Sequence, residues 1–326
     1  MHLEDVSIEG FKSFSEETDM SFQPGIGVII GNNGVGKSNI LDAIMWTLGE
    51  NSLDRIRCYE RQELFFSGSK QYPPAPAARV ELLLKDDTDK KAPGIVLARE
   101  MSRDGQNQFQ IDDIAYSFDE YQQKLSALNL RDSLQTIIRQ EEINDILQCN
   151  PSQRFDIVLA LLGLNKPGEL TKMFRQTIEP LFIRYMSYLM PMGEVKIEEM
   201  THDGKPGLDL EVILPGNRKR RAHQLSGGEK AITSLALKLA IFHQLETPFY
   251  LLDEVEPSLD YTNHKSMQAF LKDVASDKQL VMITHLRSTM DLADTLHGVR
   301  TRFDGSSFMK FYFVMDKRLL RMYKCC

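Results

Sequence analysis

The sequence lacks long apolar runs and is poor in cysteine. No stretch of about 18 or more apolar residues is present, so we expect no membrane-spanning helix. Residues 1–5 do not begin the charged-then-apolar pattern of a secretory signal, so export is not expected. The cysteines are scattered or terminal and give neither a metal-binding spacing nor a disulfide framework. They are Cys58, Cys149, Cys325 and Cys326. This usage favours a reducing, cytoplasmic location.

An excess of positive charge is also missing. The chain has 39 Lys and Arg against 46 Asp and Glu, a formal net charge of −7. Dedicated DNA-binding modules are usually basic, so tight, stand-alone DNA binding is not expected. The exception is the compact run Arg218-Lys219-Arg220-Arg221. Two interpretations of this run stay open: a solvated loop tip, or a contact with the phosphates of a nucleic acid.

What is present is a mixed pattern of strands and helices. The 326 residues, 42% of them hydrophobic, suffice for one large domain or two lobes around a buried core. Strand patterns are predicted over residues 1–10, 25–30, 79–85, 94–99, 195–199, 208–214, 249–252 and 280–283. Helical patterns are predicted over residues 39–48, 118–164 with a break at 150–151, 170–190 and 228–245. The continuous apolar strands fit a parallel sheet covered on both faces, so the predicted class is α/β.

A phosphate-binding loop follows the strand predicted at residues 25–30. The segment Gly31-Asn32-Asn33-Gly34-Val35-Gly36-Lys37-Ser38 matches G-x-x-x-x-G-K-[ST] in full, between a buried strand and a helix. The glycines let backbone N–H groups wrap around phosphate oxygens, and the helix N-terminus adds a positive dipole end. Lys37 is expected to reach the β- and γ-phosphates, and the Ser38 hydroxyl to bind Mg²⁺.

Two carboxylates end the strand predicted at residues 249–252. Asp253 and Glu254 are therefore expected at the carboxyl edge of the sheet, where α/β proteins bind ligands. In a chain with a phosphate loop, Asp253 is predicted to support Mg²⁺ and Glu254 to activate the attacking water.

A second anion site opens the helix predicted at residues 228–245. The segment Leu225-Ser226-Gly227-Gly228-Glu229-Lys230 presents a hydroxyl and backbone N–H groups at a helix N-terminus. His285 follows the next strand, at residues 280–283. This order resembles the ABC class of ATPases, in which the phosphate loop of one head and the Leu-Ser-Gly-Gly signature of another sandwich one nucleotide. There the histidine contacts the γ-phosphate.

Nearly the whole chain resembles structural-maintenance-of-chromosomes (SMC) proteins, in two blocks. Residues 1–165 carry the phosphate loop, an arginine segment with Arg57 and a glutamine segment ending at Gln140. The segment Gly10-Phe11-Lys12-Ser13-Phe14 looks like the family's opening strand, whose Lys and Ser lie by the nucleotide. Residues 166–326 carry the signature, the strand-end acids, Asp260 and His285. The resemblance implies an ABC-ATPase head: a P-loop sheet core, an antiparallel β subdomain and a helical lobe, with both blocks in one head.

The resemblance also implies the residues of the site. Nucleotide contacts are expected from Lys12, Ser13, Asn32, Asn33, Gly34, Gly36, Lys37, Ser38, Asn39, Arg57, Ser226, Gly227 and Gly228. Magnesium ligands are expected from Ser38, Gln140 and Asp253. Catalytic roles are expected for Glu254, His285, Gln140 and Asp260, the last crossing to the partner head.

Some features depart from the family pattern. Glu256-Pro257 stands where the family usually reads Asp-Ala, and Glu141-Glu142 replaces a pair that usually contains glycine. No long heptad array is present, although SMC proteins insert coiled-coil arms and a hinge between the blocks. Either the arms have been removed, with Lys166-Pro167-Gly168 as the splice, or the chain is a short relative.

Function is predicted as an ATP-hydrolysing head that dimerises around two ATP–Mg²⁺ and organises DNA on the nucleoid. The expected partners are a second SMC head, a kleisin subunit and DNA, without a membrane. Three alternatives stay open: a recombination-repair ATPase of the RecF or RecN type, a transporter ATP-binding subunit, and a non-hydrolysing clamp. Retention of Glu254 argues against the clamp.

Overall fold

The computed structural model describes residues 1–86, 93–214, 218–255 and 264–315, with only the backbone of His264. The chain forms two compact units. The first contains Met1–Ile137, Thr247–Asp253 and Ala275–Cys326, and the second contains Ile138–Glu246 and Glu254–Val274. Each unit therefore combines chain from both sides of residue 165. Within the described ranges, no helix has both the length and the apolar character needed to cross a membrane.

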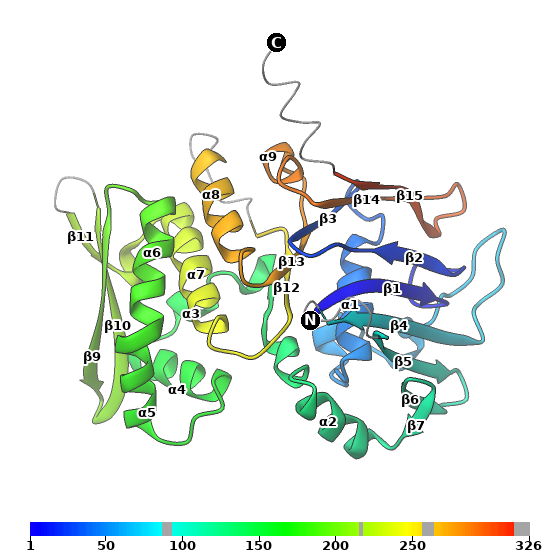
Figure 1. Ribbon diagram of the computed structural model, residues 1–326, viewed down its shortest axis with the longest axis horizontal. Helices are drawn as coiled ribbons and strands as arrows, with labels where there is room; N and C mark the ends of the chain where they lie inside the picture. The colour runs from blue at the N-terminus through cyan, green and yellow to red at the C-terminus, as the bar shows by residue number, and fades with distance from the viewer. Residues whose placement is uncertain (87–92, 215–217, 256–263, 316–326) are drawn as a thin grey trace, which may run out of the picture. The chain divides into compact units, whose positions relative to one another are not determined.

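The first unit begins with an antiparallel sheet (Figure 1). Its strand order is β2-β1-β4-β5-β6-β7. The bounds are β1 His2–Glu9, β2 Thr18–Ser21, β4 Ala77–Lys85, β5 Ile95–Ser102, β6 Asn107–Ile111 and β7 Ile114–Tyr116. Leu3, Val6 and Ile8 of β1 are fully buried. The alternating pattern at the start of the chain therefore gives the half-buried strand that it predicts.

The second sheet of this unit is parallel over its four central strands. Its strand order is β15-β14-β3-β13-β12-β8. The first residue of the short strand β8 is the last residue of the unit's first chain segment. The bounds are β3 Ile26–Ile30, β8 Ile137–Arg139, β12 Phe249–Asp253, β13 Gln279–Ile283, β14 Thr295–Thr301 and β15 Ser307–Val314. The strands β12, β13, β3 and β14 pair in parallel, whereas β15 pairs antiparallel with β14. The predicted α/β class is confirmed.

The helix α1, Lys37–Thr47, joins the two sheets into one core. Ile40 and Ile44 of α1 pack in one buried cluster with Ile8 of the antiparallel sheet and with Leu251 and Val281 of the parallel one. Smaller elements complete the unit. They are the 3₁₀ turns η1 Asp54–Ile56, η2 Arg61–Leu64 and η3 Arg131–Gln135, with α2 Phe118–Ala127 and α9 Arg287–Met290.

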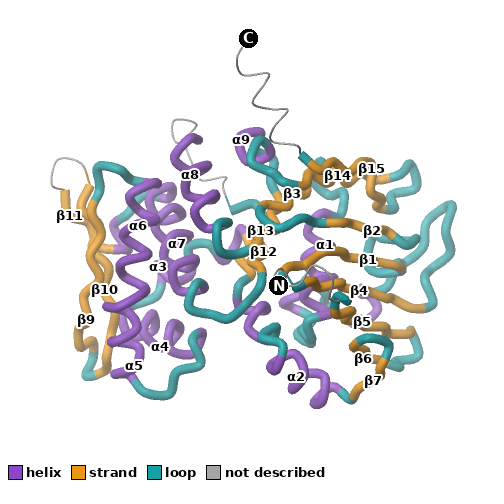
Figure 2. The backbone as a smooth tube through the Cα atoms, in the orientation of Figure 1, coloured by secondary structure: helices purple, strands orange, loops and turns teal. Residues whose placement is uncertain are grey.

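The second unit is a helical lobe with a small antiparallel sheet, drawn in purple and orange in Figure 2. Its sheet order is β11-β10-β9. The strands are β9 Glu194–His202, β10 Lys205–Leu214 and β11 Arg218–Arg221. The helices are α3 Asp145–Gln148, α4 Pro151–Leu161, α5 Pro167–Met173, α6 Glu179–Leu189, α7 Gly227–Phe242 and α8 His264–Val274. Short turns are η4 Gln140–Glu142, the π-helical η5 Phe174–Ile178 and η6 Ala222–Gln224.

Three predictions from sequence are wrong in detail. The helical pattern over residues 118–164 is interrupted, because the buried run Ile137–Arg139 forms the strand β8. Residues 10–14 are not a strand, because Gly10 and Lys12 have φ of 63° and 49° and the chain turns after β1. Of the two interpretations left open for the basic run Arg218–Arg221, the loop tip is wrong, because these residues form a strand.

Candidate functional site

The phosphate loop connects β3 to α1 as the sequence predicts. Gly34 and Gly36 have φ of 78° and 95°, in the left-handed region that favours glycine. Apart from Gly34 itself and its two chain neighbours, no atom of the described chain lies within 4 Å of the position that a Cβ on Gly34 would take. Asn32, Asn33 and Gly34 are exposed, so the loop presents its backbone to solvent. This geometry fits the phosphates of a nucleotide.

Lys37 is the first residue of α1, and its ammonium group contacts the start of the phosphate loop. Its Nζ donates to the carbonyl oxygens of Gly31 and Asn32, each at 3.0 Å. The same Nζ lies 3.3 Å from Nε2 of His285. The side chain of Lys37 is buried, whereas His285 is exposed. The structure therefore brings together two of the predicted residues at the mouth of the loop.

The parallel sheet of the first unit also contains Asp253, the first of the two strand-end acids. Asp253 ends β12 and is 8% exposed. Because β12 and β3 both pair in parallel with β13, Asp253 and the phosphate loop lie at the same carboxyl edge. One carboxylate, together with the hydroxyl of Ser38 in the first turn of α1, suits a Mg²⁺ that takes its other ligands from phosphate and water. These donors fit the predicted ion.

Glu254 follows Asp253 with a strained backbone. Its φ is 49°, one of the few positive values at a non-glycine residue. Such a conformation costs on the order of 1–3 kcal/mol and is found mainly where the surroundings over-determine the backbone, often at functional sites. The side chain is half-buried. The strained backbone thus occurs at the residue that is predicted to activate water.

Lys12 and Arg57 meet at one buried carboxylate that the sequence analysis did not single out. Oδ2 of Asp42 lies 2.6 Å from Lys12 Nζ and 2.7 Å from Arg57 Nη2, and Asp42 is fully buried. Lys12 also donates to the carbonyl of Ile56, and Arg57 Nη2 lies 3.5 Å from Asn39 Oδ1. Lys12 and Arg57 have φ of 49° and 56°. Asp42 therefore orients the side chains of two predicted nucleotide contacts.

A hollow of about 640 Å³ lies beside this cluster. Its lining includes Lys12, Ser13, Asn39 and Arg57, four residues that the family resemblance assigns to the nucleotide. Phe65 also lines it, with the guanidinium of Arg103 5.0 Å from the ring centroid. The residues that line the hollow come from segments that are distant in the sequence. The lining residues outside the predicted nucleotide contacts could therefore not be predicted from sequence.

The signature segment lies in the second unit and caps the long helix α7. The backbone N–H and the hydroxyl of Ser226 both donate to Glu229 Oε2 at 2.8 Å. The N–H of Glu229 points back to Ser226 Oγ at 3.4 Å, which completes a capping box. Ser226 and Gly227 are exposed, and Gly228 is half-buried. The helix start is therefore ordered and open to solvent.

The basic run on β11 divides between the two faces of its strand. Lys219 pairs with Glu211 and Arg221 with Asp209, each at 3.2 Å. Arg220 instead donates to the carbonyl of Gln224 at 3.0 Å. Alternation along the strand therefore leaves the charges of Lys219 and Arg221 compensated by acids on β10.

The other two cations lie beside the signature helix. Burial raises the pKa of Glu229, but hydrogen bonds from Ser226 and the charges of Arg220 and Arg218 outweigh it, so the pKa lies below its ordinary value. The ionised carboxylate of the capping box is thus favoured first by Ser226 and then by the two arginines of the basic strand.

The roles of two further predicted residues are not tested by the structure. Gln140 begins the turn η4 in the second unit and is exposed. Asp260 lies outside the described residues, as does Pro257. Neither the glutamine as a magnesium ligand nor the crossing aspartate is tested by the geometry.

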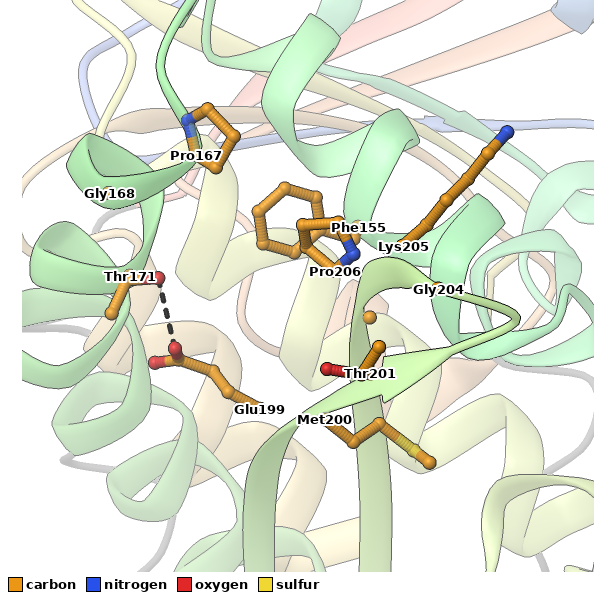
Figure 3. A pocket seen from close by; sticks show the side chains of 11 residues that line it. Phe155, Pro167, Gly168, Thr171, Glu199, Met200, Thr201, Gly204, Lys205 and Pro206 are labelled. Atoms are coloured by element: carbon orange, nitrogen blue, oxygen red, sulfur yellow. Dashed lines mark hydrogen bonds between the residues drawn. The ribbon is translucent and has the colours of Figure 1, made fainter.

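Another hollow, of about 560 Å³, lies in the second unit (Figure 3). It is lined by Phe155, by Pro167 and Gly168 at the start of α5, and by the turn between β9 and β10. Thr171 donates to Glu199 across one side at 3.0 Å. None of the site residues predicted from sequence lines it.

Comparison with known proteins identifies the family to which the chain belongs. A family model described as the RecF/RecN/SMC N-terminal domain matches residues 2–307. The chromosome partition protein Smc of Halobacteriovorax marinus is 33% identical over 175 residues, covering 51% of this chain and 14% of that protein. The Smc protein of Clostridium kluyveri is 27% identical over 284 residues, covering 83% of this chain and 22% of that protein. The chain thus spans a small part of these relatives.

Solved structures resemble the chain over almost its full length. The SMC head domain from Thermotoga maritima is 30% identical with a TM-score of 0.72, covering 95% of this chain and 98% of that one. An Smc head bound to the C-winged helix domain of ScpA is 28% identical with a TM-score of 0.88, covering 98% and 100%. The family model and these heads together show that the chain belongs to the RecF/RecN/SMC N-terminal domain family, as an SMC-type head with the predicted ABC-ATPase fold.

Proposed function

We propose that the chain binds and hydrolyses ATP, and that hydrolysis requires two heads. One observation carries the proposal: Lys37 lies on the carbonyls of the phosphate loop and contacts His285, on the sheet edge where Asp253 ends its strand. A buried lysine, an open glycine loop and a strand-end acid are the parts that position and neutralise a triphosphate.

The roles of the residues follow from their chemistry. The N–H groups of the loop and Lys37 hold the β- and γ-phosphates, and Ser38, Asp253 and Gln140 hold Mg²⁺. The ion supplies charge neutralisation when it is bound. Glu254 accepts a proton from the attacking water, and His285 helps to hold that water in line.

The second half of the site is proposed to come from a partner head. Ser226 and the N–H groups at the start of α7 form an exposed anion site, with Arg218 and Arg220 adding positive charge nearby. A γ-phosphate presented by another head would replace Glu229 as the acceptor for the Ser226 hydroxyl. Loss of the γ-phosphate on hydrolysis would release the two heads, and Asp260 is proposed to cross between them.

Two variants test the chemistry. Lys37→Ala is expected to abolish ATP binding in equilibrium titration. Glu254→Gln is expected to bind ATP, to lose at least about 100-fold in turnover and to accumulate as a dimer in gel filtration with ATP. Glu246→Gln, at an exposed acid before β12, serves as the control with wild-type turnover. Full turnover by Glu254→Gln would refute the assignment of the base.

At the level of the whole protein, we propose a role in chromosome partition on the nucleoid, with DNA and a kleisin as partners. The structure that resembles this chain with a TM-score of 0.88 is an Smc head bound to a domain of ScpA. In this chain β15 is an edge strand, and its residues Tyr312, Phe313 and Val314 are 39%, 56% and 57% exposed. Residues 316–320, which follow this strand, lie outside the described residues.

Docking on β15 can be tested with a kleisin C-terminal domain. Phe313→Asp is expected to prevent its binding in a pull-down, because a charge would be placed in an apolar interface. Ile114→Asp, at an equally exposed apolar residue of β7, is the control expected to retain binding. Equal binding by both variants would exclude this surface.

A further inference from the structure

Ser307, the first residue of β15, touches the phosphate loop from the other end of the chain. It is 1% exposed. Its N–H donates to the carbonyl oxygen of Ser13 at 2.7 Å, beside an isolated bridge between Phe14 and Ser307. The segment that turns after β1 and the segment that begins β15 therefore meet directly behind the loop.

The side chains at this point form one hydrogen-bond chain. Asn39 Nδ2 lies 2.8 Å from Ser13 Oγ, Ser13 Oγ lies 2.7 Å from Ser307 Oγ, and Ser307 Oγ lies 2.8 Å from the carbonyl oxygen of Val35. An amide nitrogen can only donate here and a carbonyl can only accept, and each hydroxyl carries one proton. Asn39 therefore donates to Ser13, and the single proton of Ser307 faces both Ser13 Oγ and the carbonyl oxygen of Val35.

The orientation of the Asn39 amide agrees with this direction. Its Oδ1 faces Arg57 Nη2 at 3.5 Å, which leaves Nδ2 toward Ser13. Arg57 can only donate, so the oxygen belongs on its side. Ser13 Oγ thus accepts from Asn39, and Ser307 Oγ is the donor that reaches the carbonyl oxygen of Val35.

The chain determines which way one peptide of the loop faces. The C=O of Val35 and the N–H of Gly36 belong to the same planar trans peptide and point in opposite directions. Because the carbonyl is held toward buried Ser307, the N–H is aimed away from Ser307. Packing here is close, since a Cβ on Gly36 would lie 2.5 Å from Ser13 Oγ and closer still to Ser307 Oγ.

We propose that Ser307 is a positioning residue of the nucleotide site: its hydroxyl holds the Val35 carbonyl and so aims the Gly36 N–H at a phosphate oxygen. The inference rests on the proposed ATP-binding function. Ser307 acts through the loop and does not itself touch the nucleotide. Nothing in the phosphate-loop motif indicates it, because Ser307 lies 272 positions from Val35.

The test is ATP affinity, measured by equilibrium titration of the full chain with a fluorescent ATP analogue and Mg²⁺. Ser307→Ala is expected to bind about tenfold more weakly, or about 1.4 kcal/mol, because the loop peptide is no longer held. KM is expected to rise by a similar factor with kcat little changed, since the contact serves ground state and transition state alike.

A matched control lies next to it. Ser306 is also fully buried, and its hydroxyl donates to Asp304 Oδ1 at 2.8 Å rather than to the loop. Ser306→Ala is expected to lower the free energy of unfolding by an amount similar to Ser307→Ala while leaving ATP affinity unchanged. A purely structural role for Ser307 would give the two variants the same ATP affinity.

Two further variants extend the test. Ser13→Ala breaks the same chain, so the Ser13→Ala/Ser307→Ala double variant is expected to lose less ATP affinity than the two single losses combined. Ser307→Cys keeps a weak donor and is expected to fall between wild type and alanine, which decides the question if Ser307→Ala does not fold.

The outcomes separate this inference from the proposed function. If the wild type does not bind ATP, the proposed function fails. If the wild type binds ATP and both Ser307→Ala and Ser307→Cys bind it equally well, the positioning role is refuted and the proposed function stands.

Discussion

The Nζ of Lys37 and the Nε2 of His285 lie 3.3 Å apart, although 248 positions separate the two residues in the chain. An ammonium group can only donate, so Nε2 of His285 is the acceptor in a hydrogen bond between these two atoms. Because Lys37 is expected to reach the γ-phosphate, the histidine lies beside the position expected for that phosphate.

Substitution of His285 tests this placement. His285→Ala is expected to lower kcat about 10- to 100-fold with less than about a threefold change in ATP affinity, because Lys37 keeps its two carbonyl acceptors. Single-turnover hydrolysis and equilibrium binding measure the two effects. His202→Ala, on β9 of the other unit, is the control. An unchanged kcat for His285→Ala would remove the residue from the site.

Loss of Asp42 is expected to destabilise the first unit. Asp42→Asn leaves Lys12 and Arg57 without their shared carboxylate, and an uncompensated charge near a buried position costs on the order of 3 kcal/mol. The free energy of unfolding in urea measures this cost. Asp54→Asn, at an exposed residue of η1, is expected to change it by less than about 0.5 kcal/mol. A similarly small effect for Asp42→Asn would show that the cluster contributes nothing.

Stability is expected to depend on pH through His297 of β14. Burial lowers its pKa from 6.5 to about 4, against the opposing hydrogen bond to the Ser21 carbonyl at 2.9 Å. The ring also packs in a tilted arrangement against the rings of Phe22 and Tyr312. Because the folded-state pKa is depressed, the neutral form stabilises the fold. That stability is complete above pH 6.5 and is lost as the pH falls toward 4.

Urea unfolding at pH 7 and pH 5 measures this dependence. The wild type is expected to lose about 2 kcal/mol through His297 between these values, at 1.36 kcal/mol for each pH unit below 6.5. His297→Gln retains a donor for Ser21 but does not titrate, so its loss on acidification is expected to be smaller by that amount. Equal losses would show that His297 titrates alike in both states.

The two faces of β11 give a paired test of DNA binding. Arg218→Glu/Arg220→Glu reverses the charges beside the signature helix, whereas Lys219→Glu/Arg221→Glu reverses charges already paired with acids on β10. If DNA is contacted here, the first variant is expected to weaken binding at low salt more strongly than the second. Unchanged binding by the first variant would dismiss this strand as a DNA contact.

The sequence was sufficient where the chemistry lies in one continuous segment. The phosphate loop, the strand-end acids and the signature each follow or precede a regular element, so local pattern predicts both the residues and their surroundings. The strands β3, β12 and β13 and the helix α7 lie close to their predicted ranges.

The sequence was insufficient where the partners are far apart. Asp42 reads as part of a helix, and its role depends on Lys12 and Arg57, which only the fold brings to it. Ser307 is one serine among many until β15 is placed against the loop. The strand β8 was missed because its three residues are too short a run to break a helical pattern.

The central claim, that one site is built from two heads, is tested most directly by ATP turnover per chain as a function of protein concentration. The wild type and Ser226→Arg are compared, since an arginine at the start of α7 would block the approach of a partner's nucleotide. We expect turnover per chain to rise with concentration for the wild type, by mass action, and to be absent for Ser226→Arg. Turnover that is independent of concentration, together with an active Ser226→Arg, would contradict the account.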